Sequence, residues 1–192
     1  MRPTLLLASN SPRRRELLLE ARFNFEIFAP RVAERFDVDL TLRELTTFNA
    51  MRKAMAAARL RPKDVVLAAD TLVAVDDRVL GKPKDKDEAV AMLQRLSGRA
   101  HEVCTSVFIC HLAEAKSTSF HEISRVQFCR LSRDRIDNYL ARVNPLDKAG
   151  AYAAQGFGSE IIKKIDGSFT NVVGLPMKRT IAALAEFGVV SK

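Results

Sequence analysis

The sequence predicts an α/β fold built around a mixed β-sheet. Short apolar runs typical of buried strands alternate along the chain with segments that carry helix-capping residues and helical periodicity. Of the 192 residues, 47% are hydrophobic and 28% are charged, which is enough apolar material for a core and excludes a disordered chain. With 8 glycines and 7 prolines there is no low-complexity linker, so we expect one domain spanning residues 1–192.

Capping residues mark the helix starts in the first half of the chain. Ser11 followed by Pro12 is typical of an N-cap and a first helical position. Thr41 and Glu44 match a capping box, which opens an alanine-rich helix. The predicted elements of this half are a strand at 4–8, a helix from 12, a strand at 25–28, a helix from 42 that ends before 62, a strand at 65–75 and, after a turn at Asp76 and Asp77, a strand at 78–80.

The second half continues the alternation. Asp85 with Glu88 indicates a helix start, and Gly98 is a suitable C-terminal cap. Two long β-rich runs predict a hairpin, and a stretch of small residues and glycines predicts a shaped loop. The predicted elements are a helix from 85 to 97, strands at 101–112 and 117–128, a helix from 132 to about 144, the loop at 147–158, a hairpin of 161–165 and 169–173 across Asp166 and Gly167, and a helix from 176 to 188.

The charge balance indicates an anionic partner. The 31 basic and 23 acidic side chains give a net charge of +8, which suits nucleic acid, a membrane surface or a phosphate-bearing small molecule alike. Aromatic residues make up 7% with no Trp, which weakens a reading as a single-strand nucleic-acid binder. The 3 cysteines are expected as reduced thiols, and no apolar run approaches about 20 residues. We therefore expect a cytoplasmic protein without a membrane span.

A basic cluster, Ser9-Asn10-Ser11-Pro12-Arg13-Arg14-Arg15, lies between the first predicted strand and helix. Backbone N–H groups at a helix start attract anions, and adjacent guanidinium groups strengthen that attraction. The pattern favours phosphate binding, although it is neither a P-loop nor a dinucleotide fingerprint. The alternative is a solvated basic first turn.

Asp70 is the second candidate, because it interrupts an otherwise apolar strand. A carboxylate there is costly to bury unless it is paired or holds a metal, and it could orient water or ligate a divalent ion. The alternative is an exposed Asp at a strand end. Glu34 is a second possible metal carboxylate, Lys53 and Lys82 could neutralise phosphate charge, and Gln155 in the glycine-rich loop offers both an amide donor and an acceptor.

Six segments occur in order along the chain, and together they resemble the Maf family of nucleoside triphosphate pyrophosphatases. These segments are SNSPRRRELL (9–18), AADT (68–71), GKP (81–83), LSGRAHEV (96–103), DKAGAYAAQG (147–156) and NVVGLP (171–176). The resemblance implies two lobes around a deep cleft, similar to the inosine triphosphatase architecture. It also implies hydrolysis of a nucleotide to its monophosphate and pyrophosphate with a divalent cation, Mg²⁺ or Mn²⁺.

The resemblance also implies roles for individual residues. Asp70 corresponds to the catalytic base, and Asp70 with Glu34 to the metal-binding carboxylates, although Ala33 and Arg35 replace the acidic neighbour often found beside this Glu. The loop around DKAG and Gln155 resembles the branch that acts on dTTP and UTP, and a homodimer is a family expectation. The remaining implied residues are Arg13, Thr71 and Gln155 for substrate specificity and Ser9, Arg13, Arg14, Lys53 and Lys82 for phosphate binding.

Two classes of function follow from these observations. The first is a nucleotide pyrophosphatase acting on dTTP and UTP, with a 7-methyl-GTP pyrophosphatase as the alternative within the same family. The second is a non-catalytic regulator of cell division that binds a nucleotide or nucleic acid, which the net charge alone allows. Asp70 and Glu34 argue against nucleic acid as a partner, since carboxylates repel a phosphate backbone unless a metal intervenes.

Overall fold

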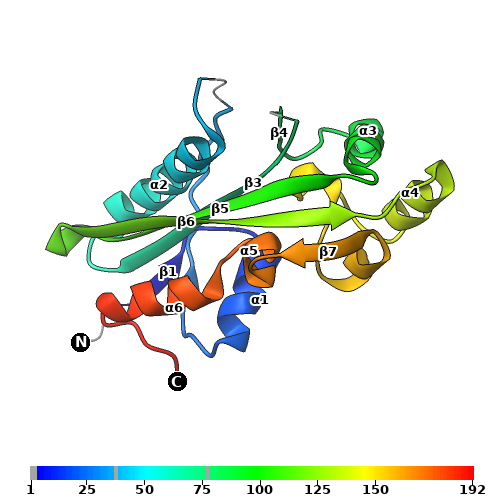
Figure 1. Ribbon diagram of the computed structural model, residues 1–192. Coiled ribbons are helices and arrows are strands. Elements are labelled where there is room, and N and C mark those ends of the chain that lie inside the picture. Colours follow the sequence, from blue (N-terminus) through cyan, green and yellow to red (C-terminus); the bar gives the residue numbers. More distant parts are fainter. Residues whose placement is uncertain (1–3, 37–38, 77) are drawn as a thin grey trace. The chain divides into compact units, whose positions relative to one another are not determined.

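The computed structural model describes residues 4–36, 39–76 and 78–192 (Figure 1). Its contacts divide the chain into two compact units, which are described separately. Three long strands run through both: β3 (Val65–Val75), β5 (Ala100–His111) and β6 (Lys116–Phe128). Unit 1 comprises Met1–Asp70, Thr105–Glu122 and Gly174–Lys192, and unit 2 comprises Thr71–Cys104 and Ile123–Val173.

The strands form a mixed sheet in the order β2-β1-β3-β5-β6-β7, with β4 paired to β3. β1 (Leu5–Leu7) pairs in parallel with β2 (Glu26–Ile27) and with β3. β4 (Arg78–Leu80) and β7 (Ile162–Asp166) are antiparallel to their neighbours β3 and β6. The predicted α/β class with a mixed sheet is confirmed.

Helices α1 (Pro12–Glu20), α2 (Leu42–Leu60) and α6 (Met177–Glu186) belong to unit 1. In Figure 1, α2 lies on one face of the unit 1 strands and α1 and α6 lie on the other. α2 begins with the predicted capping box: the Thr41 hydroxyl accepts from Glu44 N–H at 3.3 Å, and Thr41 N–H donates to the Glu44 carboxylate at 2.9 Å. Small side chains allow α2 to pack closely on β1 and β3, and Ala54, Ala57 and Ala58 are fully buried there.

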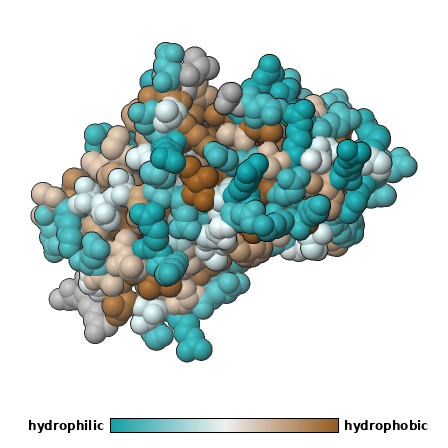
Figure 2. Space-filling view, viewed as in Figure 1, coloured by the Kyte–Doolittle hydropathy of each residue, from teal (hydrophilic) through white to brown (hydrophobic). Residues whose placement is uncertain are grey.

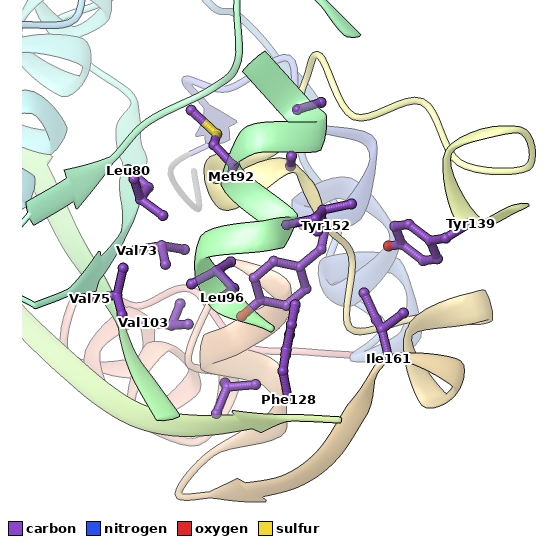
Figure 3. Packing of buried hydrophobic residues seen from close by; sticks show 14 of the residues in the cluster. Val73, Val75, Leu80, Met92, Leu96, Val103, Phe128, Tyr139, Tyr152 and Ile161 are labelled. Atoms are coloured by element: carbon purple, nitrogen blue, oxygen red, sulfur yellow. The ribbon is translucent and has the colours of Figure 1, made fainter. Parts of the chain in front are cut away.

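Unit 2 has a separate hydrophobic core (Figure 3). Its helical residues come from α3 (Lys86–Leu96), α4 (Arg133–Leu140) and the 3₁₀ turn η2 (Ala149–Ala151); a second 3₁₀ turn, η3 (Gly156–Glu160), contacts β7. Phe128 and Tyr152 meet edge to face at the centre, with ring centroids 4.8 Å apart. Aromatic pairs in this geometry contribute beyond their buried area, so they stabilise the loop that carries Tyr152.

The predicted hairpin of 161–165 with 169–173 is wrong. The first segment forms β7, which pairs with β6, and the second forms the short helix α5 (Phe169–Val173). Ser168 starts this helix by accepting a hydrogen bond from Asn171 N–H at 3.2 Å. The Asn171 amide then donates to Val103 O and to Ser124 Oγ, at 3.1 and 2.9 Å, which anchors the turn in the interior. These tertiary hydrogen bonds override the β-rich composition of the segment.

The other predicted elements are present, some of them with shifted ends. β3 has the predicted bounds, whereas α4 ends at Leu140, earlier than expected. Asp77 of the predicted turn lies outside the described residues, and Asp76 adopts a positive φ of 48°. Hydrophilic and apolar residues are interspersed on the face shown in Figure 2. Among the described residues, no helix is both long enough and apolar enough to cross a membrane.

Candidate active site

The centre of the candidate site is Lys53, which projects from α2 between two carboxylates. Its Nζ lies 2.5 Å from Asp70 Oδ1 and 2.8 Å from Glu34 Oε1. Asp70 comes from β3, and Glu34 from the irregular segment between β2 and α2. One ammonium therefore joins two carboxylates that are far apart in the sequence, all within unit 1.

Asp70 is 3% exposed and lies inside β3, so the alternative of an exposed strand-end Asp is wrong. Burial raises the pKa of this carboxyl group, and the negative charge of Glu34 acts in the same direction. Lys53 and Arg14 oppose the rise in pKa because they stabilise the charged form. A carboxylate with a raised pKa accepts a proton more readily, which suits a general base.

Arg14 is the buried member of the arginine cluster, at 9% exposure. Its Nε donates to Gly174 O at 2.8 Å, and a terminal nitrogen donates to Ser9 Oγ at 3.0 Å. Burial lowers the pKa of its guanidinium, while Asp70 and Glu34 raise it. These hydrogen bonds explain how a cation is tolerated at a helix N-terminus, where the dipole opposes it.

The start of α1 differs in detail from the prediction. Ser11 is at the N-cap position and Pro12 follows it, but the Ser11 hydroxyl makes no capping hydrogen bond. Instead Ser9 Oγ accepts from Ser11 N–H at 3.2 Å, in addition to its bond from Arg14. Arg13, the next side chain of the cluster, is half-buried. Ser9 and the two arginines thus belong to the same unit as Glu34, Lys53 and Asp70.

The other predicted residues, Thr71, Lys82 and Gln155, belong to unit 2. Thr71 and Gln155 are half-buried, and Lys82 is exposed. The loop that carries Gln155 is tied to the GKP segment, since Gly150 N–H donates to Gly81 O at 3.0 Å.

The Gln155 loop has no space for a side chain at Gly158 and a tight fit for one at Gly150. A Cβ at Gly158 would lie 2.4 Å from Ala153 O, and one at Gly150 would lie 3.1 Å from Val73. Gly150 also has a φ of +67°, which disfavours other residues. The small residues of DKAGAYAAQG therefore shape a compact loop around Gln155.

The donor set of unit 1 fits a divalent cation. Glu34 and Asp70 already share one positive charge, that of Lys53, and carboxylate oxygens are hard ligands. Mg²⁺ commonly takes one or two protein carboxylates and completes its shell with water and substrate phosphates. Among residues 4–36, 39–76 and 78–192, no group of three or more His, Cys, Asp or Glu side chains is arranged to hold a metal without such help.

Comparisons with known proteins identify the family of the chain. The Maf-like protein family matches residues 4–187. The chain belongs to the Maf family. It is 45% identical over 185 residues to a dTTP/UTP pyrophosphatase of Bacillus pumilus (strain SAFR-032), covering 96% of this chain and 97% of that one. It is 44% identical over 184 residues to a dTTP/UTP pyrophosphatase of Carboxydothermus hydrogenoformans, covering 96% and 98%.

Among solved structures, this Maf chain is similar to a HAM1 protein from Coxiella burnetii. The TM-score is 0.57 at 14% identity, and the match covers 96% of this chain and 99% of that one. Identity this low establishes the fold alone, and the predicted similarity to the Maf/Ham1-like architecture is confirmed.

Sequence reasoning missed one polar residue in the site of this Maf chain. Asn49 is 2% exposed and lies one helical turn before Lys53, and its Nδ2 donates to Asp70 Oδ2 at 3.3 Å. Asparagine is unfavourable in the middle of a helix, where its amide competes with the backbone. An Asn four residues before a candidate functional Lys is the signal that could have identified it.

Proposed function

We propose that this chain is a nucleoside triphosphate pyrophosphatase that hydrolyses dTTP and UTP to the monophosphate and pyrophosphate. The observation that carries the proposal is the buried Asp70 paired with Lys53 beside Glu34, in a chain 45% identical to a protein named dTTP/UTP pyrophosphatase. Such an activity would remove unwanted nucleotides from the cellular pool.

The proposed reaction is attack of water on the α-phosphorus. Asp70 accepts the proton as the new P–O bond forms, and the bond from the α-phosphorus to the bridging oxygen breaks to release pyrophosphate. Without a bound cation, burial and the charge of Glu34 raise the pKa of Asp70, which favours acceptance of a proton. Lys53 keeps the carboxylate in place through its 2.5 Å contact with Oδ1.

Cations hold the triphosphate in this proposal. Ser9, Arg13, Arg14, Lys53 and Lys82 bind phosphate oxygens, and charge-assisted hydrogen bonds of this kind become stronger as negative charge builds on the leaving group. Glu34 and Asp70 would hold Mg²⁺ or Mn²⁺, which supplies further neutralisation of phosphate charge when bound.

The base is selected by the residues of the Gln155 loop in this proposal. Uracil and thymine present an N3–H donor between two carbonyl acceptors, and an amide can accept from the first and donate to one of the second. Thr71 and Arg13 contribute to the same selection. The dTTP and UTP branch is preferred to the 7-methyl-GTP alternative on the names of the relatives at 44–45% identity.

The test is release of pyrophosphate from a panel of triphosphates with Mg²⁺, using the parent protein and Asp70→Asn. The parent is expected to prefer dTTP and UTP. Asp70→Asn keeps the shape of the side chain and removes its basicity, so hydrolysis is expected to fall by at least ~10²-fold. Nucleotide binding is expected to persist. Near-parental turnover in Asp70→Asn would exclude this residue as the base, and a parent without activity on any triphosphate would refute the function.

The homodimer and the cytoplasmic location stay predictions, as does any link to cell division. Gel filtration with light scattering would establish the assembly state of the purified chain.

A further inference from the structure

Asn49 makes three hydrogen bonds that involve both polar atoms of its amide. Its Oδ1 accepts from Arg35 N–H at 3.0 Å, and its Nδ2 donates to Arg35 O at 3.0 Å and to Asp70 Oδ2 at 3.3 Å. The backbone N–H of Arg35 can only donate, so the oxygen of the amide must face it and the NH₂ group must face the carboxylate. Both NH₂ hydrogens and the oxygen are therefore engaged.

These bonds are part of a wider attachment to α2 of residues 33–35, which we call the Glu34 segment. Arg52 donates to Ala33 O at 2.8 Å, and Lys53 contacts the Glu34 carboxylate. Asn49 bonds both the N–H and the carbonyl oxygen of Arg35. Positions i, i+3 and i+4 share one helix face, so three side chains of α2 hold three consecutive residues. Asn49 binds this segment by its backbone, which holds the segment whatever rotamers its side chains adopt.

Among the described hydrogen bonds, Asn49 is the link between this backbone and Asp70. Lys53 also contacts both carboxylates, but through the end of a flexible four-carbon chain. The short Asn side chain has two χ angles and is 2% exposed, so it has little freedom to move. It therefore sets the separation between the Glu34 segment and Asp70 more rigidly than Lys53 does.

We propose that Asn49 is a positioning residue, which fixes the Asp70 carboxylate and the Glu34 segment relative to each other for reaction. This inference rests on the proposed function for its kinetic consequence, but the attachment of Arg35 to Asn49 can be measured without it. Asn49 acts through its two partners and touches no substrate in this proposal.

The test compares the parent with Asn49→Ala and with Ser106→Ala as a matched control. Ser106 is fully buried on β5, and its hydroxyl bonds Thr46 and Thr47 of the same helix, at 2.7 and 3.0 Å. For Asn49→Ala we expect kcat for dTTP to fall on the order of 10²-fold, as misplacement of a reacting group does, with KM changed less than about threefold. For Ser106→Ala we expect kcat within about twofold of the parent, with a lower Tm.

Hydrogen exchange of the Arg35 amide, followed by NMR, supplies a readout independent of activity. Loss of the acceptor in Asn49→Ala is expected to speed this exchange at least ~10-fold relative to both the parent and Ser106→Ala. Asn49→Asp is the second variant, in case the first does not fold. Its carboxylate still accepts from Arg35 N–H but cannot donate to Asp70, so exchange is expected to stay slow while kcat falls.

The outcomes separate the two proposals. Parental kcat in both Asn49 variants, or unchanged Arg35 exchange in folded Asn49→Ala, would overturn the positioning role. A parent that releases no pyrophosphate would refute the function, while the exchange measurement would still establish whether Asn49 holds the Glu34 segment.

Discussion

Acidification should destabilise unit 2 through His101. This side chain is 2% exposed and its Nε2 lies 2.7 Å from the Tyr152 hydroxyl, with the ring packed edge to face against Phe128 and Tyr152. Its Nδ1 is buried with no hydrogen-bond partner among the described residues. Burial lowers the pKa of His101 from 6.5 to about 4, because protonation would place a charge and an unmatched donor in the core.

The sign of the effect follows from which state of the chain, folded or unfolded, binds the proton more tightly. The unfolded chain takes up the proton near pH 6.5, whereas the folded chain resists it until about pH 4. The contribution of neutral His101 is therefore complete above pH 6.5 and is lost as the pH falls from 6.5 towards 4. At about 1.4 kcal/mol for each pH unit, the free energy of unfolding should drop by roughly 3 kcal/mol over this interval.

Urea unfolding of the parent and of His101→Gln between pH 7.5 and 4 measures the contribution of His101 to the free energy of unfolding. The chain has no Trp and 2 Tyr, and both tyrosines, Tyr139 and Tyr152, are buried in unit 2, so tyrosine fluorescence reports on this unit. The Gln variant keeps a polar group near Tyr152 and has nothing to titrate. The free energy of unfolding of the parent minus that of the variant should fall by roughly 3 kcal/mol on acidification. The contributions of the carboxylates are common to both proteins and cancel in this difference. Parallel pH profiles would refute the reasoning.

Three further predictions concern the site and the fold. Gln155→Ala should reduce kcat/KM for dTTP and UTP on the order of 10²-fold more than for CTP, since each neutral group left unpaired costs ~1–3 kcal/mol. Gln155→Glu should disfavour uracil, because a carboxylate has no donor. Equal losses over dTTP, UTP, CTP, GTP and 7-methyl-GTP would mean that Gln155 only supports the loop. Arg13→Ala should cost about 1.5–3 kcal/mol in transition-state binding with native circular dichroism, and EDTA should abolish parental turnover; full activity in EDTA would remove the metal from the mechanism. Gly167→Ala should lose at least ~1 kcal/mol more stability than Gly188→Ala in thermal unfolding. A Cβ at Gly167 would lie 2.8 Å from Ser124 Oγ and φ is +115° there, whereas Gly188 has open space and a φ of +72°, closer to the left-handed region. Equal losses would contradict this account.

Local signals in the sequence predicted most of the fold. The β-rich run at 65–75 and the Thr41 capping box gave elements with the expected bounds or start, because both signals are contained in a few neighbouring residues. The helix at Phe169–Val173 could not be predicted in this way. Its conformation depends on Asn171 reaching Val103 O and Ser124 Oγ, which are 68 and 47 residues away in the chain.

The same distinction between local signals and long-range contacts applies to the candidate site. An Asp inside an apolar strand is conspicuous, and so is a cluster of arginines before a helix, so Asp70 and Arg14 could be singled out from residue type alone. That Arg14 donates to Gly174 O could not be read from the sequence, since the partner is a backbone carbonyl 160 residues away. The role of Asn49 was hidden for the same reason, because its partner Arg35 offers only main-chain atoms.

The boundary between the two units has a consequence for how such proteins diversify. It falls between Asp70 and Thr71, which are consecutive residues of β3, so the candidate base ends one unit and a candidate specificity residue begins the next. The bonds of Asp70 to Lys53 and Asn49 join three residues of unit 1, so a substitution at Thr71 or Gln155 removes none of the bonded atoms. Under the proposed roles, a lineage that changes its preferred base through Thr71 or Gln155 alters residues of unit 2 alone, while Arg13 and the cluster of Glu34, Lys53 and Asp70 in unit 1 keep their sequence.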